Sequence, residues 1–242
     1  MTQEIYTIVS NRPLTADAYE MRLAGDTSAI TAPGQFINIQ IRGLFLRRPI
    51  SICDWDGSGL TIIYKVVGKG TAEMAQMRPG GELDAICGLG NGFDVSKCGH
   101  KTLVIGGGVG VPPMYGLAKA LLNVGKKPVA VLGFNQKEEM FYEPEFRALG
   151  VETIIATADG SYGRKGFVTD ALPAEYDCFC ACGPLPMLKA VYHACGTSGF
   201  MSFEERMGCG FGACMGCTCK TKYGNKRICR DGPVLEKEEI IW

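Results

Sequence analysis

Residues 102–113 read Thr-Leu-Val-Ile-Gly-Gly-Gly-Val-Gly-Val-Pro-Pro, and a stretch of helical character, Met114 to Val124, follows them. The apolar run predicts a short buried strand, and the glycines predict a tight turn into the helix. Glycines let phosphate oxygens approach the backbone, and a helix N-terminus attracts a pyrophosphate. The spacing departs from a strict GxGxxG, so a turn that serves only close packing is the alternative interpretation.

Strands and helices continue to alternate after this turn. We expect strands at 129–134, 151–157 and 178–182, and helices at 143–149 and 186–195. This alternation predicts a parallel sheet with right-handed crossovers, which is typical of a Rossmann-like nucleotide domain. Its last strand runs into Cys182-Gly183-Pro184, which brings a second loop to the carboxyl edge where such sheets bind nucleotides. We assign residues 100–200 to this domain.

The preceding residues, 1–99, alternate between apolar and polar side chains as antiparallel strands do. The clearest runs are Ile5–Val9, Tyr19–Leu23, Gln35–Ile41 and Leu60–Val66. Turn residues separate them, and a short helix is expected from Thr71 to Met77. The pattern predicts a small antiparallel β-barrel.

Residues 201–242 are rich in glycine and cysteine and show little periodicity, so something other than their own core must hold them. Cys209, Cys214, Cys217 and Cys229 follow the CxxxxCxxC…C order of plant-type [2Fe–2S] ligands. A structural zinc site and ordinary buried thiols are the alternatives, although zinc sites usually pair two close cysteine knuckles. Cys219 is expected to be a spare thiol.

Composition excludes several classes of function. The 242 residues carry 25 basic and 25 acidic side chains, so no overall field attracts nucleic acid or an anionic membrane. The longest uncharged run, 102–118, contains five glycines and a Pro-Pro pair, which excludes a spanning helix. Twelve cysteines without a secretory signal indicate a reducing, cytoplasmic location rather than a disulfide framework. With two histidines, histidine-based metal or triad chemistry has little support.

Two weaker motifs lie outside these stretches. Arg47-Arg48-Pro49-Ile50-Ser51 and Gly68-Lys69-Gly70-Thr71 occur in the barrel. An arginine can neutralise a diphosphate and Ser51 can hydrogen-bond a flavin ring, whereas a solvated Arg-Arg pair is the simpler interpretation. The alternating Cys178-Phe-Cys-Ala-Cys182 places three thiols on one face of a strand. We expect Cys178 and Cys180 to be core residues and Cys182 to reach the ligand edge.

The order of these elements resembles the ferredoxin-NADP reductase superfamily. More closely, it is similar to the electron transfer subunits of dihydroorotate dehydrogenase B, iron–sulfur flavoproteins that accompany a separate catalytic subunit. The stretches that carry the resemblance are Leu46–Ser51, Gly106–Pro113, Asp159–Gly163, Glu205–Cys214 and Cys229–Pro233. It covers essentially the whole chain and implies three domains: an FAD-binding barrel (1–99), an NAD-binding domain (100–200) and a [2Fe–2S] domain (201–242).

The resemblance also implies the site residues. FAD would be bound by Arg48, Pro49, Ile50, Ser51, Ile63, Tyr64, Lys65, Gly70 and Thr71. The nicotinamide cofactor would be bound by Gly106, Gly107, Gly108, Gly110, Val111, Pro112, Cys182, Gly183 and Pro184, and the cluster by Cys209, Cys214, Cys217 and Cys229. Ser51 and Cys182 would contact the reacting rings. Ile50 stands where the wider superfamily has a tyrosine, so that aromatic contact is lost here, as in the closer family.

The implied function belongs to pyrimidine biosynthesis. Dihydroorotate would be oxidised at FMN in the partner subunit, and electrons would pass through the cluster and FAD to NAD⁺ in a heterotetramer with two copies of each subunit. A small subunit of an NADPH–ferredoxin oxidoreductase is one alternative, but it typically has aspartate at the first cluster ligand, where this chain has Cys209. A zinc-stabilised interaction module is another. NAD is favoured by family only, because Lys137 could meet a 2′-phosphate or face solvent.

Overall fold

The computed structural model describes all 242 residues, and its N-terminal region is a closed antiparallel barrel. The six strands follow the order β1-β2-β5-β4-β3-β6, with α1 after β5. Their bounds are β1 (Thr2–Pro13), β2 (Ala18–Ala24), β3 (Phe36–Ile39), β4 (Arg48–Asp56), β5 (Gly59–Lys65), α1 (Lys69–Ala75) and β6 (Glu82–Leu89). The predicted barrel is confirmed, and the helix begins two residues earlier than expected.

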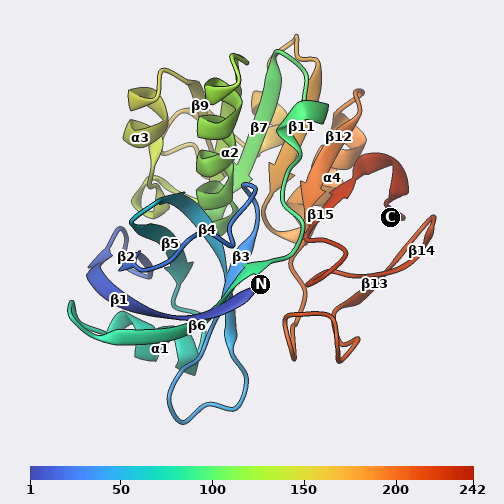
Figure 1. Ribbon diagram of the computed structural model, residues 1–242. Helices are drawn as coiled ribbons and strands as arrows, with labels where there is room; N and C mark the ends of the chain where they lie inside the picture. Colours follow the sequence, from blue (N-terminus) through green and yellow to red (C-terminus); the bar gives the residue numbers. More distant parts are fainter.

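The second region is a seven-stranded sheet with the order β10-β9-β8-β7-β11-β12-β15 (Figure 1). All neighbours are parallel except β15, which pairs antiparallel with β12. The strands are β7 (Thr102–Gly107), β8 (Val129–Phe134), β9 (Glu152–Thr157), β10 (Arg164–Lys165), β11 (Cys178–Cys182), β12 (Gly199–Ser202) and β15 (Val234–Glu236). The predicted parallel sheet is confirmed.

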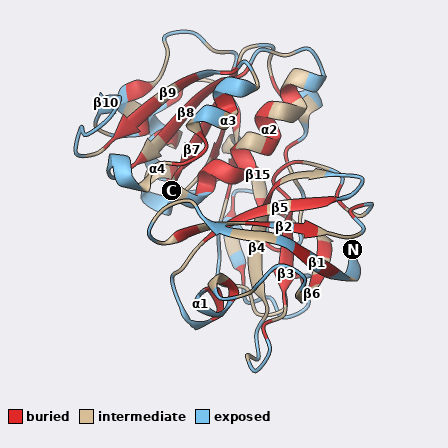
Figure 2. Cartoon of the chain, turned by 90° about the vertical axis from the view of Figure 1, so that its left-hand side faces the viewer, coloured by how far each residue is buried: buried red, intermediate tan, exposed pale blue.

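Two apolar layers cover the faces of this sheet. The helices are α2 (Val111–Asn123), α3 (Glu143–Ala148) and α4 (Leu185–Ala194), and the 3-10 turns are η1 (Val95–Lys97), η2 (Gly108–Gly110), η3 (Lys137–Glu139), η4 (Val168–Ala171) and η5 (Lys237–Glu239). Helices α2 and α3 pack on one face together with barrel residues, and α4 and η4 pack on the other. The central strands β7, β8 and β11 are almost wholly buried between them (Figure 2). No helix combines the length and apolarity needed to cross a membrane.

The C-terminal region depends on its neighbours for a core, as its composition indicated. A short hairpin of β13 (Thr218–Thr221) and β14 (Gly224–Arg227) stands apart from the sheet, and β15 then joins the sheet edge. Ile228, Leu235 and Ile240 are buried in the same cluster as α4 and β11. On the barrel side, the Asn91 amide donates to the carbonyl of Gly232 at 2.6 Å. The segment is therefore anchored to both larger regions.

Candidate functional site

The glycine loop after β7 lies where the strand order of the sheet reverses. From β7 the chain moves outward through β8 and β9, and then crosses to β11 and β12 on the other side. Sheets of this kind bind ligands in the crevice beyond the carboxyl ends of the strands at such a switch point. Cys182 pairs in register with Gly106, so the loops that leave β7 and β11 begin side by side.

Close packing explains most of the glycines in this loop. A Cβ on Gly110 would lie 2.2 Å from the carbonyl oxygen of Cys182, and a Cβ on Gly107 would lie 2.4 Å from Sδ of Met187. Gly108 differs, because its φ is +52° and no atom lies within 4 Å of its Cβ position. The two interpretations of the motif therefore apply to different glycines. Gly106, Gly107 and Gly110 allow close packing of the loop against its neighbours, whereas Gly108 borders open space.

The first turn of α2 offers fewer amide donors than a usual helix start. Pro112 and Pro113 have no N–H, and the Val111 N–H donates to the carbonyl of Gly108. Backbone donors for a phosphate must therefore come from the turn itself, residues 108–110. The helix contributes the positive end of its dipole.

Cys182 carries a neutral thiol at this edge. Burial raises the pKa of the thiol to about 12, and a hydrogen bond with Ser202 offsets only part of that shift. Its neighbours on the strand, Cys178 and Cys180, are buried in the same core layer, which confirms the prediction that the three cysteines share one face.

The loops after β8 and β9 are tied together at the same carboxyl edge. The Lys137 amide donates to Oγ of Ser161 at 2.8 Å, and that hydroxyl donates to Asp159 at 2.7 Å. The Lys137 ammonium lies 5.9 Å from the ring centroid of Tyr162. The Asp159–Gly163 motif therefore shapes this edge of the sheet.

The predicted flavin residues of the barrel come together around Arg48. A Cβ on Gly70 would lie 2.3 Å from Nε of Arg48, so the start of β4 and the start of α1 are in close contact. The Thr71 hydroxyl accepts from the amides of Val67 and Gly68 at 3.0 and 3.3 Å, which shapes the turn before α1. Arg48 and the Gly70-Thr71 turn thus lie side by side.

Strand β5 supplies the remaining predicted flavin residues. The Tyr64 ring is inside the barrel, where its hydroxyl donates to Asn11 at 2.9 Å, so only its backbone is free to face a cofactor. Ile63 faces the apolar layer of α2, and Lys65 pairs with Asp17 at 2.9 Å. Strand β5 also contacts η2. The predicted flavin and nucleotide regions are therefore adjacent.

The four predicted ligand cysteines form two pairs. Cys209 and Cys214 accept hydrogen bonds from each other's backbone amides at 3.4 Å, and the Cys229 amide donates to the sulfur of Cys217 at 3.4 Å. No three His, Cys, Asp or Glu side chains converge to hold a single ion. Each pair offers two thiolates, the number that each iron of a [2Fe–2S] cluster takes from the protein.

Backbone amides prepare the first pair for negative charge. Burial opposes ionisation of Cys209, but the amides of Cys214, Phe211 and Ala213 point at its sulfur and together hold its pKa at about 6. The Ala213 N–H lies 3.2 Å from that sulfur. Hydrogen bonds of this kind stabilise thiolates and tune iron–sulfur centres. The donor set therefore suits the cluster that the spacing predicts.

Sequence reasoning missed the residues that hold the cluster loop. Nη1 of Arg227 donates to the carbonyl of Gly212 at 2.9 Å, and Asp231 fixes this guanidinium at 3.1 Å. Nδ2 of Asn38, on the barrel, donates to the carbonyl of Cys209 at 3.1 Å. Arg227 and Asp231 are four residues apart, which is a weak signal for an ion pair. No pattern in the sequence marks Asn38.

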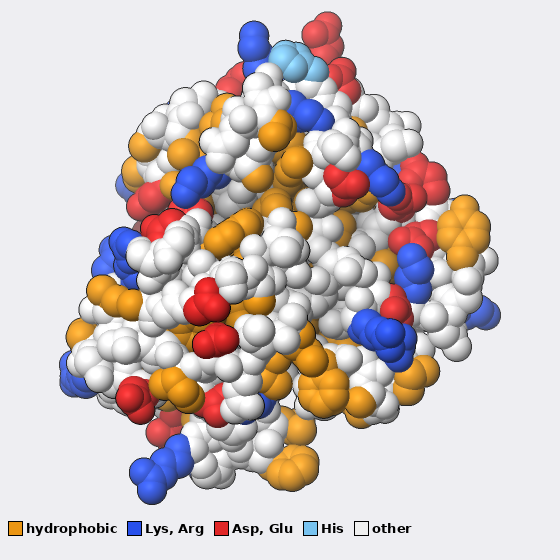
Figure 3. Space-filling model, in the orientation of Figure 1, with side chains coloured by type: hydrophobic (Ala, Val, Ile, Leu, Met, Phe, Trp, Pro, Cys, Tyr) orange, Lys and Arg blue, Asp and Glu red, His pale blue; other side chains and the backbone are white.

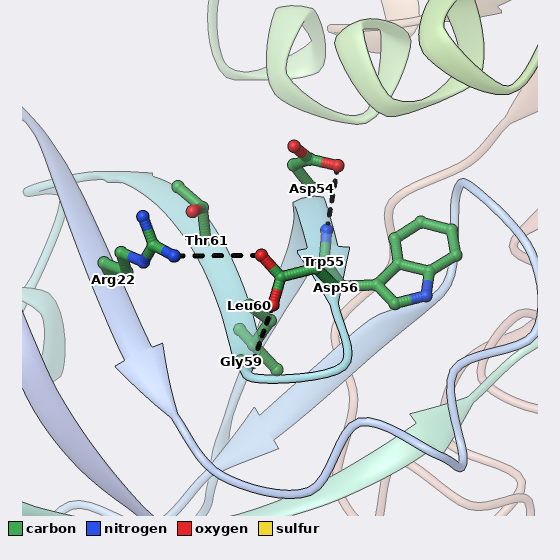
Figure 4. A pocket seen from close by; sticks show the side chains of 7 residues that line it. All are labelled: Arg22, Asp54, Trp55, Asp56, Gly59, Leu60 and Thr61. Carbon is green, nitrogen blue, oxygen red and sulfur yellow. Dashed lines mark hydrogen bonds and ion pairs between the residues drawn. The ribbon is translucent and has the colours of Figure 1, made fainter.

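Two hollows lie away from these motifs. One of about 60 Å³ is enclosed by the β4–β5 hairpin and Arg22, whose guanidinium pairs with Asp56 at 3.7 Å (Figure 4). The other, of about 350 Å³, lies where the three regions meet, and two ion pairs, Lys97–Glu236 and Lys226–Glu239, border it. Neither contains a residue of the predicted sites.

Comparisons with known proteins agree with this arrangement. Residues 204–241 match the model of the iron-sulfur cluster binding domain of dihydroorotate dehydrogenase B, and residues 104–203 match that of an oxidoreductase NAD-binding domain. A dihydroorotate dehydrogenase B (NAD(+)) electron transfer subunit of Fusobacterium nucleatum is 47% identical over 99% of both chains. Its counterpart in a Geobacillus species is 43% identical over 100% of this chain and 99% of its own.

Solved structures show the same fold. An NADH-dependent reduced ferredoxin-NADP oxidoreductase, described for flavin-based electron bifurcation, aligns with a TM-score of 0.89 at 29% identity, over 98% of this chain and 90% of its own. A ferredoxin NADP+ reductase of Neisseria gonorrhoeae aligns with a TM-score of 0.69 at 15% identity, over 80% of this chain and 90% of its own. Because full-length relatives at 43–47% identity share one description, the chain belongs to the family of dihydroorotate dehydrogenase B electron transfer subunits.

Proposed function

We propose that this chain carries electrons between a dihydroorotate-oxidising partner subunit and NAD⁺ in pyrimidine biosynthesis. It is an oxidoreductase subunit that uses FAD, a [2Fe–2S] cluster and NAD. One observation carries the proposal: β5 contacts the glycine turn of the nucleotide domain, and β3 of the same barrel contacts the cysteine loop. The barrel therefore lies between the nucleotide site, which exchanges two electrons at once, and the cysteine loop, whose cluster exchanges one electron at a time.

The barrel residues would hold the flavin. Bound FAD supplies the chemistry that couples single electrons to hydride transfer. The Arg48 guanidinium is fixed beside Gly70, where it can pair with the diphosphate by charge-assisted hydrogen bonds. Ser51 is half-buried on β4 and can donate to a ring atom. Pro49 gives the outer face of β4 an apolar contact, whereas the Ile50 side chain packs toward the barrel interior and would contribute its backbone, as would β5.

The switch point would hold the dinucleotide. Gly108 leaves the turn open to a phosphate, whereas Gly106, Gly107 and Gly110 keep the two loops packed together. Cys182 presents a neutral thiol at the carboxyl end of β11, so it can pack against a nicotinamide ring without repelling hydride by charge. We assign Gly183 and Pro184 to the same contact surface.

Cys209, Cys214, Cys217 and Cys229 would hold the two irons. The first pair lies nearer the surface, since Cys214 is exposed, whereas Cys217 and Cys229 are buried. Amide donors already point at three of the four sulfurs. The protein's contribution is to desolvate one iron and leave the other within reach of an electron donor.

We assign the partner to the exposed side of the cluster loop. Phe211 is 44% and Met215 54% exposed beside Cys214, and Met215 has a positive φ of 61°. The space-filling view shows apolar side chains over this loop, at the lower right (Figure 3). Apolar surface next to a redox centre suits a protein partner that must approach closely. We propose an FMN-containing catalytic subunit there, in a heterotetramer with two copies of each chain.

The partner can be tested by reconstitution. We expect the purified chain alone to bind no orotate and to leave dihydroorotate unoxidised. Adding the FMN subunit should restore dihydroorotate-dependent reduction of NAD⁺, and Met215→Glu should weaken that restoration without changing NADH oxidation by an artificial acceptor. Orotate bound to the isolated chain would overturn the subunit assignment. Equal coupling to ferredoxin without the FMN subunit would favour the ferredoxin oxidoreductase alternative.

Because all twelve cysteines are unpaired, we place the complex in a reducing cytoplasm.

A further inference from the structure

Tyr142 begins helix α3 in a backbone conformation that tyrosine rarely adopts. Its φ is 69° and its ψ is 3°, which lie in the left-handed region, and Met215 is the one other non-glycine residue with a positive φ. A side chain in this region crowds the adjacent carbonyl, so the conformation persists only where the surrounding structure holds it. Tyr142 is 7% exposed, and its contacts show what holds it.

The hydroxyl of Tyr142 crosses from the nucleotide domain to the barrel. It donates to Oε2 of Glu20 on β2 at 2.8 Å. Oε1 of the same carboxylate accepts from Nε of Arg12 at 2.8 Å, so both oxygens of Glu20 are used. Burial raises the pKa of the Tyr142 hydroxyl well above its ordinary value, so the group remains a donor. The bond therefore ties α3 to β2.

The ring of Tyr142 packs within the nucleotide domain. It meets the Tyr115 ring of α2 edge-on, with centroids 5.1 Å apart, and Tyr115 meets the Phe146 ring of α3 at 5.4 Å. The backbone of α2 in turn lies against β4, because a Cβ on Gly116 would be 2.5 Å from the Cys53 carbonyl oxygen. Figure 1 shows α2 and α3 directly above β2, β4 and β5. Tyr142 thus joins both helices to the barrel.

The elements that Tyr142 joins also carry the two proposed cofactor sites. Glu20 is directly opposite Ile63 of β5, a residue assigned to the flavin. Ser51 lies on β4, which packs on α2. Helix α2 begins at the glycine turn assigned to the dinucleotide. A displacement of α2 and α3 on the barrel would therefore change the distance between the nicotinamide and the flavin.

We propose that Tyr142 is a positioning residue for hydride transfer, and that its bond to Glu20 fixes the nucleotide domain on the flavin barrel. This inference rests on the proposed function, since it requires the nicotinamide at the switch point and FAD on the barrel. Reacting atoms must lie about 3–3.5 Å apart, and a displacement of about 1 Å can lower a rate about 100-fold. The strained backbone of Tyr142 places the phenol where it can reach Glu20 across the domain boundary.

The test compares Tyr142→Phe with Tyr6→Phe in the full-length protein purified under anaerobic conditions. Tyr6 is 0% exposed, and its hydroxyl donates to the carbonyl of Asp26 at 2.7 Å, within the barrel. Each variant loses one buried hydroxyl and its hydrogen bond, but only Tyr142→Phe loses a bond between domains. We measure the rate constant of flavin reduction at saturating NADH, the dissociation constants of FAD and NAD⁺, and the charge-transfer absorbance between the reduced flavin and NAD⁺.

For Tyr142→Phe we expect flavin reduction about tenfold slower at saturating NADH and a weaker charge-transfer absorbance. Both dissociation constants should stay within about threefold of the wild type. Tyr6→Phe should lower the melting temperature and leave the rate constant and the absorbance unchanged.

Glu20→Ala removes the acceptor of the same bond instead of the donor. It should slow flavin reduction about as much as Tyr142→Phe does. The double variant should be no slower than either single variant, because the two changes remove one shared interaction.

An unchanged rate constant and absorbance in Tyr142→Phe would overturn the inference, as would an equal loss in Tyr6→Phe. A wild-type chain that binds no flavin, or whose flavin NADH does not reduce, would instead overturn the proposed function. The two failures are therefore distinguishable.

Discussion

The chain contains two glycine-rich loops, and they are held in different ways. The loop at residues 106–110 packs against its own domain, where Gly110 meets the backbone of Cys182. The loop at residues 208–216 is held by contacts from elsewhere: Asn38 of the barrel, Arg227 of the hairpin and, in the proposed function, iron. The first loop is fixed by a core and the second by polar contacts and a cofactor. A substitution that disturbs packing should therefore damage the first loop, and loss of a polar contact or a ligand should damage the second.

The largest effect is expected for Cys229→Ser. This buried thiol is paired with Cys217, so its loss should leave one iron with a single protein thiolate and release the C-terminal segment. We expect loss of cluster affinity beyond the roughly 10–100-fold that removal of an outer-shell partner costs. Iron and acid-labile sulfide per chain measure it.

Cys219→Ser is the matched control. Cys219 lies on β13, two residues after Cys217, and should leave the iron content unchanged. A loss of iron equal to that of Cys229→Ser would show that the fourth ligand is misassigned.

Gly110→Ala should damage the first loop and spare the second. The new Cβ would lie 2.2 Å from the Cys182 carbonyl, a backbone atom that cannot swing away. We expect a loss of about 1–3 kcal/mol in unfolding free energy and NADH binding weakened at least tenfold, with flavin and iron retained.

Gly196→Ala has open space around its Cβ and should change the unfolding free energy by no more than about 0.5 kcal/mol. Isothermal titration with NADH and denaturant unfolding give both quantities. Wild-type NADH affinity in Gly110→Ala would contradict the placement of the dinucleotide at the switch point.

Arg227→Lys probes the polar contacts of the second loop. Lysine cannot span both the Gly212 carbonyl and Asp231, so the loop should loosen and the cluster should be lost to a chelator about tenfold faster. Arg42→Lys, on an exposed barrel loop, is the control. Equal rates in both variants would mean that the hairpin does not support the cluster.

The smallest effect concerns pH. Burial raises the pKa of Cys182 to about 12, so its thiol stays protonated and neutral well above the working range. The rate of NADH oxidation should therefore show no titration from this group between pH 6 and 9. Cys182→Ala should lower kcat with the pH profile unchanged in shape. A rate that rises through pH 8–9 in the wild type and is flat in the variant would indicate a reactive thiolate instead.

The same contrast explains what the sequence could predict. The strands and helices around residues 102–195 follow from the spacing of apolar residues, since each buries its face within one domain. The four cysteines follow from ligand chemistry alone. The strands that were not anticipated are β4, β6, β10, β12, β13, β14 and β15. Strand β15, for example, is only three residues long and forms by pairing with β12, which no local pattern indicates.

The directions of individual side chains could not be predicted from the sequence either. Tyr64 is part of the flavin stretch by resemblance, yet its ring is inside the barrel and bonded to Asn11. Asn38 had no motif, because its partners are 9 to 171 residues away. Such contacts depend on the register of β3 with β4 and on the docking of the C-terminal segment, neither of which a local pattern encodes.

The central claim is that one chain couples a two-electron nucleotide site to a one-electron cluster through a flavin. The most direct test is an anaerobic assay of the purified chain for flavin, iron and acid-labile sulfide, with electron paramagnetic resonance before and after addition of NADH. The account predicts about one flavin for two irons and two sulfides, and a [2Fe–2S] signal that appears only after NADH. Zinc in place of iron, or a cluster that NADH leaves oxidised while flavin is present, would contradict it.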